Sequence, residues 1–197
     1  MKIITFEKIK SLGIHSSQCY RWTEYMIRNK KNAILPPKIS MKPYDGVFCN
    51  VMPSIITSDN NAYAGVKIVT RYPLREPSLD SKILLCNAKN GEYLALFDGD
   101  WITSMRTGAV AAHSIMLLAK HNYQIIGAMG LGNVTRATTQ ILLEMNPHKT
   151  FLFKLLQYKG QEKVFAERFS CYPNFFHEFF ENVHDIVNES DVLISGV

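Results

Sequence analysis

The sequence lacks the features that define several large classes of protein. It has only 4 cysteines in 197 residues, and none belongs to a CxxC pair, which excludes a disulfide framework and the common zinc sites. We expect free, buried thiols in a reducing compartment. The N-terminus is too polar for a secretory signal, and no run of about 18 apolar residues is present. These absences predict a cytoplasmic protein with no membrane partner.

Concentrated basic charge is also missing. The net charge is +5, but the densest basic run, residues 28–31, is typical of a solvated helix end. We therefore predict no nucleic-acid partner, and a modest positive field that suits anionic small molecules. The 6 histidines show no metal-ligand spacing, so we predict no metal and assign them packing or surface roles.

The first half of the chain has a β-rich pattern after one helix. Residues 14–30 predict a helix, and short β-rich runs follow from Gly46 to Phe97. Between two apolar runs stands Lys89-Asn90-Gly91, a strong signal for a hairpin. This half is therefore predicted to carry an antiparallel sheet.

In the second half, strands and helices alternate. A long helical pattern at 100–120 precedes strands at 123–129, 151–156 and 191–195, with helices at 133–145 and 162–169. Such alternation predicts a parallel α/β sheet, with a boundary near Asn122. Four phenylalanines stand at helical spacing and are predicted to pack in the core: Phe175, Phe176, Phe179 and Phe180.

A glycine turn is the first feature with chemical meaning. Gly130 and Gly132 follow an apolar strand and open a helix, as in turns that hold a dinucleotide pyrophosphate on the helix N-terminus. The third position of that fingerprint is Thr135 rather than glycine or alanine, so an ordinary strand-to-helix turn stays an alternative.

Three cations have both a functional and an ordinary interpretation. In dinucleotide-binding folds an acidic residue at the end of the second strand binds the ribose hydroxyls, but no carboxylate follows the strand at 151–156. Lys159, near that position, is either a partner for a cofactor 2′-phosphate or a surface lysine. Arg106, among small residues in the helix at 100–120, either grips an anion or is exposed. Lys67, inside an apolar strand, is either a base with a pKa lowered by burial or a solvated side chain.

Several segments together resemble the ornithine cyclodeaminase/mu-crystallin family. The block at 82–92, its continuation at 98–109, the Gly65-Val66-Lys67 strand and the turn at 130–136 occur in family order and spacing. Met52-Pro53-Ser54 is similar to the family's Met-Pro-small element. The resemblance runs from about residue 35 to residue 197.

This resemblance implies a fold and a set of roles. The fold class is α/β: an N-terminal α+β substrate and dimerisation domain, residues 1–121, precedes an incomplete Rossmann-type domain, residues 122–197, that binds NAD or NADP. The protein is expected to be a homodimer. Lys67 and Arg106 are the implied catalytic and substrate-binding residues, with Lys38 holding the carboxylate. The implied cofactor-binding residues are Ser81, Arg106, Gly130, Gly132, Asn133, Val134, Lys159 and Val197.

The leading functional hypothesis is conversion of L-ornithine to L-proline and ammonia, with NAD taking a hydride from the substrate Cα and returning it. The alternatives are a ketimine reductase or amino-acid dehydrogenase, and a non-catalytic mu-crystallin-like binding protein. The family's catalytic aspartate lies beyond the strand at 191–195, where this sequence stops. We therefore do not expect full catalysis from these residues alone.

Overall fold

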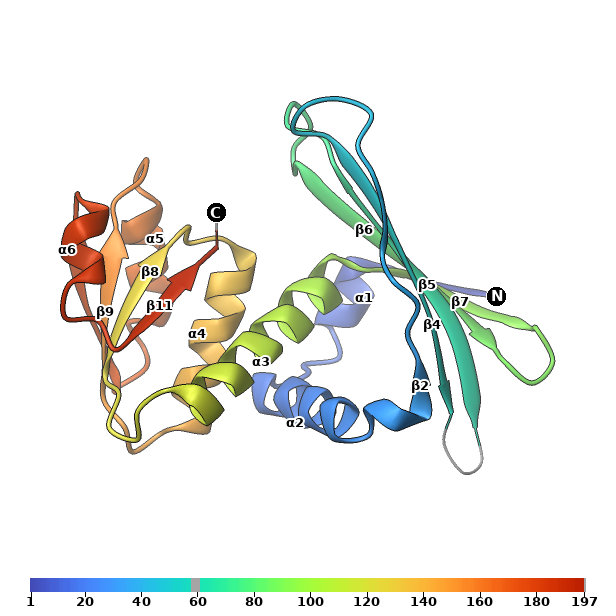
Figure 1. Cartoon of the computed structure of the whole chain (residues 1–197), viewed down its shortest axis with the longest axis horizontal. Coiled ribbons are helices and arrows are strands. Elements are labelled where there is room, and N and C mark those ends of the chain that lie inside the picture. The colour runs from blue at the N-terminus through green and yellow to red at the C-terminus, as the bar shows by residue number, and fades with distance from the viewer. Residues whose placement is uncertain (58–60, 197) are drawn as a thin grey trace. The chain divides into compact units, whose positions relative to one another are not determined.

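The computed structural model describes residues 1–57 and 61–196, and the chain forms two compact units (Figure 1). Unit 1 comprises residues 1–14 and 25–103, and unit 2 comprises residues 15–24 together with the chain from Ser104 onward. One antiparallel-rich sheet and one parallel sheet confirm the predicted α/β class. The division of roles between residues 1–121 and 122–197 stays a prediction.

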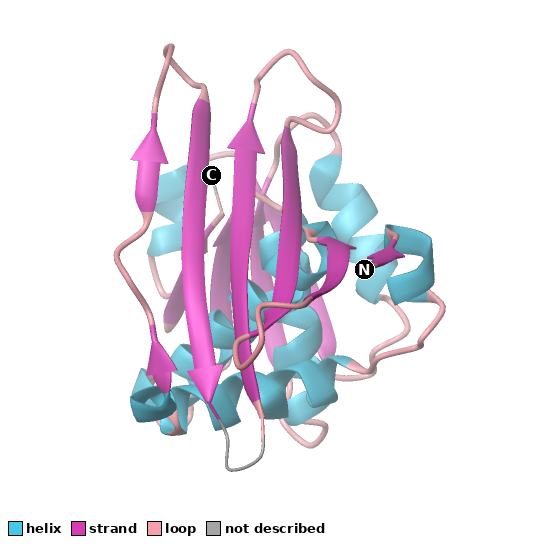
Figure 2. Ribbon diagram, turned by 90° about the vertical axis from the view of Figure 1, so that its right-hand side faces the viewer, coloured by secondary structure: helices cyan, strands magenta, loops and turns pink. Residues whose placement is uncertain are grey.

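Unit 1 is built on a 7-stranded sheet in the order β1-β7-β6-β5-β4-β2, with β3 also paired to β4. Figure 2 shows its long strands face on. The predicted hairpin is confirmed, because β6 and β7 are antiparallel and Gly91 has a φ of 76° in the turn. The strands are β1 (Lys2–Ile4), β2 (Ala33–Ile34), β3 (Ile39–Met41), β4 (Phe48–Thr57), β5 (Ala62–Arg71), β6 (Leu79–Asn87) and β7 (Tyr93–Asp98).

The register divides this sheet into two faces, because side chains alternate along a strand. The face that we call the Lys67 face carries polar and apolar side chains: Asn50, Met52, Lys67, Val69, Ser81 and Ile83. The opposite face, called the Ile68 face, carries the charged side chains of Asp80, Lys82 and Asp98 at one end and apolar side chains elsewhere: Ile3, Ile39, Met41, Val51, Ile68 and Leu84.

Unit 2 contains a 4-stranded parallel sheet in the order β10-β9-β8-β11. The strands are β8 (Ile125–Met129), β9 (Phe151–Leu156), β10 (Phe175–Phe180) and β11 (Val192–Ser195). They alternate with α4 (Asn133–Met145), α5 (Gln161–Phe169) and α6 (Val183–Val187), which confirms the predicted strand–helix alternation. Fully buried aromatic rings of β9 and α5, among them Phe153 and Phe165, form the centre of its core.

The remaining helices are α1 (Phe6–Lys10), α2 (Ser16–Arg28), the 3-10 helix η1 (Lys30–Asn32) and α3 (Asp100–Leu118). The predicted helices at 14–30 and 100–120 are confirmed by α2 and α3. Over the described residues, none of the helices combines the length and the apolar composition needed to cross a membrane. All four cysteines are free thiols, although only Cys19 is buried, which corrects the expectation that all are buried.

The start of α2 is fixed within unit 2 by polar contacts. The Glu144 carboxylate accepts hydrogen bonds from Ser16 Oγ, from Gln140 Nε2 at 2.9 Å and from Tyr172 Oη at 2.9 Å. Tyr20 Oη lies 2.9 Å from His113 Nδ1, and both side chains are buried. The packing role predicted for His113 is therefore confirmed.

The prediction for the phenylalanines at 175–180 was wrong. They form β10, an edge strand parallel to β9, rather than a helix. Only Phe175 is buried, whereas Phe176 is 54% exposed. Apolar residues at i, i+1, i+4 and i+5 also fit a strand, in which alternate side chains share a face. The His177 ring accordingly lies between Phe175 and Phe179, at centroid distances of 5.5 and 5.1 Å.

The carboxylate of Asp191, directly before β11, forms hydrogen bonds with the backbone at the start of β8. Asp191 Oδ2 accepts hydrogen bonds from the backbone N–H groups of Gln124 at 2.9 Å and Ile125 at 3.0 Å. These bonds, with Lys120 Nζ at 3.6 Å, lower the pKa of Asp191. A lowered folded-state pKa contributes stability above the unfolded pKa of about 3.9, and this stability disappears as the pH falls through the folded value.

We therefore predict that Asp191→Asn lowers the thermal unfolding midpoint near pH 7, and that the difference from the wild type shrinks as the pH falls below about 4. Thermal unfolding followed by circular dichroism across this pH range checks the prediction. Asp185→Asn in α6, which leaves the β8–β11 connection intact, is the control. A difference between wild type and variant that stays constant with pH would contradict the prediction.

Candidate functional site

The turn after β8 has the geometry that the sequence predicts. Gly130 has a φ of 75°, a left-handed conformation that favours glycine. Thr135 is 1% exposed, and its Oγ1 donates a hydrogen bond of 2.6 Å to the carbonyl of Gly130. The threonine that departs from the dinucleotide fingerprint therefore closes the turn with its hydroxyl.

The helix that follows begins without a side-chain cap. Gly132 is the N-cap of α4, and a Cβ built there would meet nothing within 4 Å. The first N–H groups of any α-helix have no acceptor within the helix, and they carry the positive end of its dipole. Asn133 and Val134, which are predicted to cradle phosphates, are the first two residues of α4. The local geometry suits an anion.

A third glycine, Gly196, follows β11 and packs against this turn. Gly196 N donates to Met129 O at 2.7 Å, and a Cβ at Gly196 would lie 2.4 Å from Thr135 Oγ1 and 2.7 Å from Gly130 O. In Figure 1 the end of β11 accordingly lies beside the start of α4. The strand order reverses between β8 and β11, and open parallel sheets bind ligands outside the carboxyl ends of their strands at such a reversal.

The end of β9 lies next to β8 in the same sheet. Lys159 has a φ of 52° and its Nζ lies 5.2 Å from the centre of the Tyr158 ring. The Glu162 carboxylate accepts a hydrogen bond of 3.0 Å from Tyr158 N, and backbone N–H groups of Glu162 and Tyr158 lower its pKa. Because this carboxylate already bonds the backbone, it does not replace the acidic residue that the fingerprint lacks.

On the Lys67 face of unit 1, Lys67 and Ser81 are diagonal neighbours, since Lys67 pairs with Ile83 and Ser81 with Val69. Ser81 is 3% exposed, and its N and Oγ donate to Asp100 Oδ1 at 2.7 and 3.0 Å. A Cβ at Gly99 would lie 2.6 Å from Ser81 Oγ, so the turn into α3 requires a glycine there. The Ser81 hydroxyl is thus held in a defined position.

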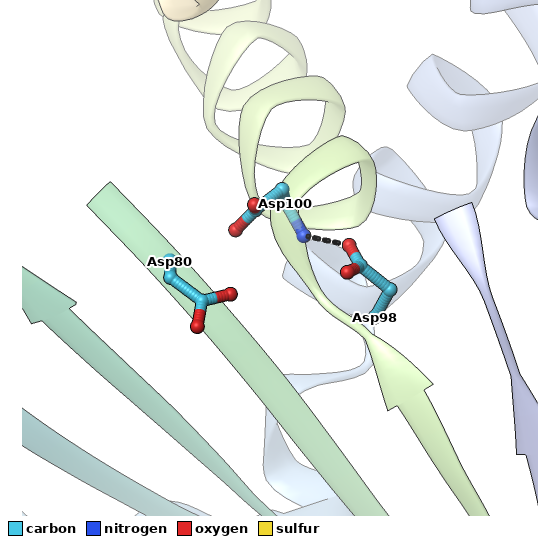
Figure 3. Close-up of side chains that lie close together, drawn as sticks. All are labelled: Asp80, Asp98 and Asp100. Carbon is cyan, nitrogen blue, oxygen red and sulfur yellow. Dashed lines mark hydrogen bonds between the residues drawn. The ribbon is translucent and has the colours of Figure 1, made fainter. Parts of the chain in front are cut away.

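Three carboxylates, those of Asp80, Asp98 and Asp100, lie within 4.8 Å of one another (Figure 3). A lysine already neutralises two of them, because Lys82 Nζ lies 2.6 Å from Asp80 and 3.1 Å from Asp98. The hydrogen bond to Asp80 raises the pKa of Lys82 and keeps it charged. Asp100 accepts the hydrogen bonds from Ser81, so the cluster is explained by contacts within the chain.

Arg106, Lys38 and Val197 complete the set of predicted site residues. Arg106 lies on α3 and is exposed, and partial desolvation of its guanidinium lowers its pKa without neutralising it at physiological pH. Lys38 is exposed and stands directly before β3, whose first residue, Ile39, pairs with Val51. Val197 lies outside the described residues. The roles of all these residues stay predictions.

Comparison with known proteins identifies the family. The model of the ornithine cyclodeaminase/mu-crystallin family matches residues 2–196. The chain belongs to this family. Among curated members, it is 25% identical over 157 residues to a Delta(1)-pyrroline-2-carboxylate reductase of Bacillus thuringiensis subsp. konkukian, covering 74% of this chain and 45% of that protein. It is 28% identical over 152 residues to mouse ketimine reductase mu-crystallin, covering 75% of this chain and 46% of that protein.

A solved family member has the same fold. Thermococcus litoralis Delta(1)-pyrroline-2-carboxylate reductase, in complex with NADH and L-proline, superposes with a TM-score of 0.84 at 25% identity. The superposition covers 99% of this chain and 61% of the Thermococcus chain. The chain therefore spans less than half of the curated relatives named above and about three fifths of this solved one.

Sequence reasoning missed two residues that shape the site. Gly196 directly follows an apolar strand, and a glycine at the end of a strand indicates a close approach of another backbone segment. Asp100, in Asp98-Gly99-Asp100, is an acidic residue at a helix start, which is a common capping pattern. Its hydrogen bonds to Ser81 depend on strand register, which the sequence alone did not supply.

We predict that Thr135→Val lowers the free energy of unfolding by about 1–2 kcal/mol, because it preserves the shape but leaves the Gly130 carbonyl without its donor. Thr139→Val in the same helix is the matched control, since Thr139 Oγ1 is buried and has no hydrogen-bond partner among the described residues. We expect Thr139→Val to be neutral or stabilising. Urea unfolding of both variants checks this, and equal losses would refute the role assigned to the Thr135 hydroxyl.

Proposed function

We propose that this chain binds a nicotinamide dinucleotide at the turn after β8, as part of an oxidoreductase that reduces a small cyclic imino acid. The main support for the proposal is the close packing of Gly196 against Gly130, next to the start of α4, which has no side-chain cap. This packing lies where the strand order reverses. Backbone N–H groups and open space at Gly132 suit a pyrophosphate. Asn133, Val134, Gly130 and Gly132 are the residues that would hold it.

The proposed substrate class is the one that the curated relatives favour. One is a pyrroline-2-carboxylate reductase and another a ketimine reductase. The reaction is a hydride addition: C2 of the cyclic iminium receives a hydride, the C=N π pair moves to nitrogen, and a saturated cyclic amino acid such as L-proline forms. A bound reduced nicotinamide supplies this hydride and leaves oxidised. Conversion of L-ornithine to L-proline and ammonia remains the second candidate. Its only support is that the chain belongs to the family.

The side chains of this chain would bind and orient the substrate. Arg106 offers a planar guanidinium for a carboxylate, and Lys38 offers a second positive charge. Lys67 is an ammonium donor on the same face as the positioned Ser81 hydroxyl. We assign Lys67 to proton handling at the substrate and Ser81 to contact with the cofactor. Lys159 would distinguish NADP from NAD through its 2′-phosphate.

We predict that Gly132→Asp raises the dissociation constant for NADH by at least about tenfold relative to Gly132→Asn. Both residues fit the open space and are good N-caps, but only aspartate places a negative charge where the pyrophosphate would lie. Titration of nicotinamide fluorescence measures the constants. Equal affinity of the two variants would contradict the proposed cofactor position.

Turnover separates the remaining candidates. Oxidation of NADH or NADPH with Delta(1)-pyrroline-2-carboxylate, followed at 340 nm, supports a reductase, whereas release of ammonia from L-ornithine supports a cyclodeaminase. Binding of the dinucleotide without turnover of any amino or imino acid, measured on the whole protein as its source organism makes it, supports a non-catalytic binding protein. A comparison of NADH with NADPH decides the role of Lys159.

We further propose that the Ile68 face pairs with a second copy of this chain. Ile3, Ile39, Met41 and Ile68 on this face are 72, 57, 47 and 41% exposed. Several exposed apolar side chains on one face of a sheet indicate an interaction site, and most soluble oligomers are symmetric homo-oligomers.

We predict that Ile68→Asp raises the dimer dissociation constant by at least about tenfold, because it would bury a carboxylate in the interface while its cross-strand neighbour Lys82 already pairs with Asp80 and Asp98. Light scattering coupled to gel filtration measures the mass. Leu74→Asp is the control, since Leu74 is fully exposed at 103% in the loop between β5 and β6 and is not part of a strand. A dimer that survives Ile68→Asp, or a monomeric wild type, would rule out this interface.

A further inference from the structure

A buried amide on the Lys67 face is not used by the mechanism above. Asn50 lies within β4 and is 9% exposed. Its Oδ1 is buried and has no hydrogen-bond partner among the residues that the structure describes. Asparagine is depleted in strands, and a buried polar atom without a partner destabilises the fold. Such an atom requires an explanation.

The register places Asn50 next to the predicted substrate-binding side chains. Asn50 pairs with Val69 on one side, and Ser81 pairs with the same Val69 on the other. Lys67 stands two residues before Val69 on the same face of β5 and pairs with Met52. Asn50, Lys67 and Ser81 therefore surround Val69 on one face of the sheet, all within unit 1.

The chemistry of these three side chains differs. The Lys67 ammonium only donates hydrogen bonds. The Ser81 hydroxyl bonds Asp100 Oδ1 at 3.0 Å and lies 3.2 Å from Thr103 Oγ1. Asn50 Oδ1 is a buried acceptor that lacks a donor. The missing donor for Asn50 Oδ1 could be an N–H group of a ligand. The carboxylate of the same ligand would be attracted by the positive charge of Lys67.

We propose that Asn50 is a specificity-determining residue whose Oδ1 accepts a hydrogen bond from the ring N–H of a cyclic amino acid or of a protonated cyclic imine, the iminium form. This inference rests on the proposed function and names the substrate feature that the site would select. A site built to accept an N–H discriminates strongly against an analogue that lacks one, because the buried acceptor is then left unpaired.

The test compares two ligands of nearly equal shape. L-Proline has a ring N–H, whereas tetrahydrofuran-2-carboxylate has an oxygen in that position. Their dissociation constants are measured by calorimetry with saturating NADH for the wild type, Asn50→Leu, Asn50→Asp and Cys49→Ala. Cys49 is adjacent in β4 and lies on the opposite face, so Cys49→Ala is the matched control.

We expect the wild type and Cys49→Ala to prefer L-proline by at least about tenfold, and Asn50→Leu to lose this preference. Asn50→Asp, which keeps an acceptor, should retain it or increase it, with unchanged affinity for NADH. A preference that persists in Asn50→Leu, or that a folded Asn50→Asp loses, overturns the inference alone. A wild type that binds NADH but neither ligand overturns the proposed substrate class together with it.

Discussion

The left-handed backbone at Gly130 is the constraint on which the predicted cofactor site depends. It lets the chain leave β8, turn sharply and enter α4 within a few residues, so that the helix start points at the end of the sheet. The Thr135 hydroxyl closes this turn and Gly196 packs against it without a side chain. The backbone conformation of Gly130 and these two contacts therefore keep backbone N–H groups available to an anion at the strand-order reversal.

The second constraint is the register of the unit 1 sheet. Since side chains alternate with period 2, a shift of one residue in β4 or β6 would move Asn50 or Ser81 to the opposite face. The observed pairing keeps them with Lys67, and it gathers the exposed isoleucines on the other face. One sheet thus separates the face of Asn50, Lys67 and Ser81, which we propose to bind substrate, from the face of the exposed isoleucines, which we propose to meet a second copy of the chain.

Much of this arrangement follows from local patterns. The Asn90-Gly91 turn predicts the β6–β7 hairpin, and the strand–glycine–helix pattern around Gly130 predicts α4 with its observed bounds. The pattern at 175–180 led to a wrong prediction of a helix, because apolar residues spaced by one and four positions fit a strand and a helix equally well. Which applies depends on whether β9 offers a free edge, and that is a property of the whole sheet.

The sequence by itself determined the α/β class and the glycine turn, because these depend on residues near one another in the chain, and it determined the family, because the family's motifs occur in the same order and spacing. Only the tertiary structure decided that Gly196 meets Gly130, that Asp100 holds Ser81, and that Asn50 lies beside Lys67 with a buried acceptor. Each of these relations joins strands or turns distant in sequence, and it is fixed by the register and order of strands, which no local propensity specifies.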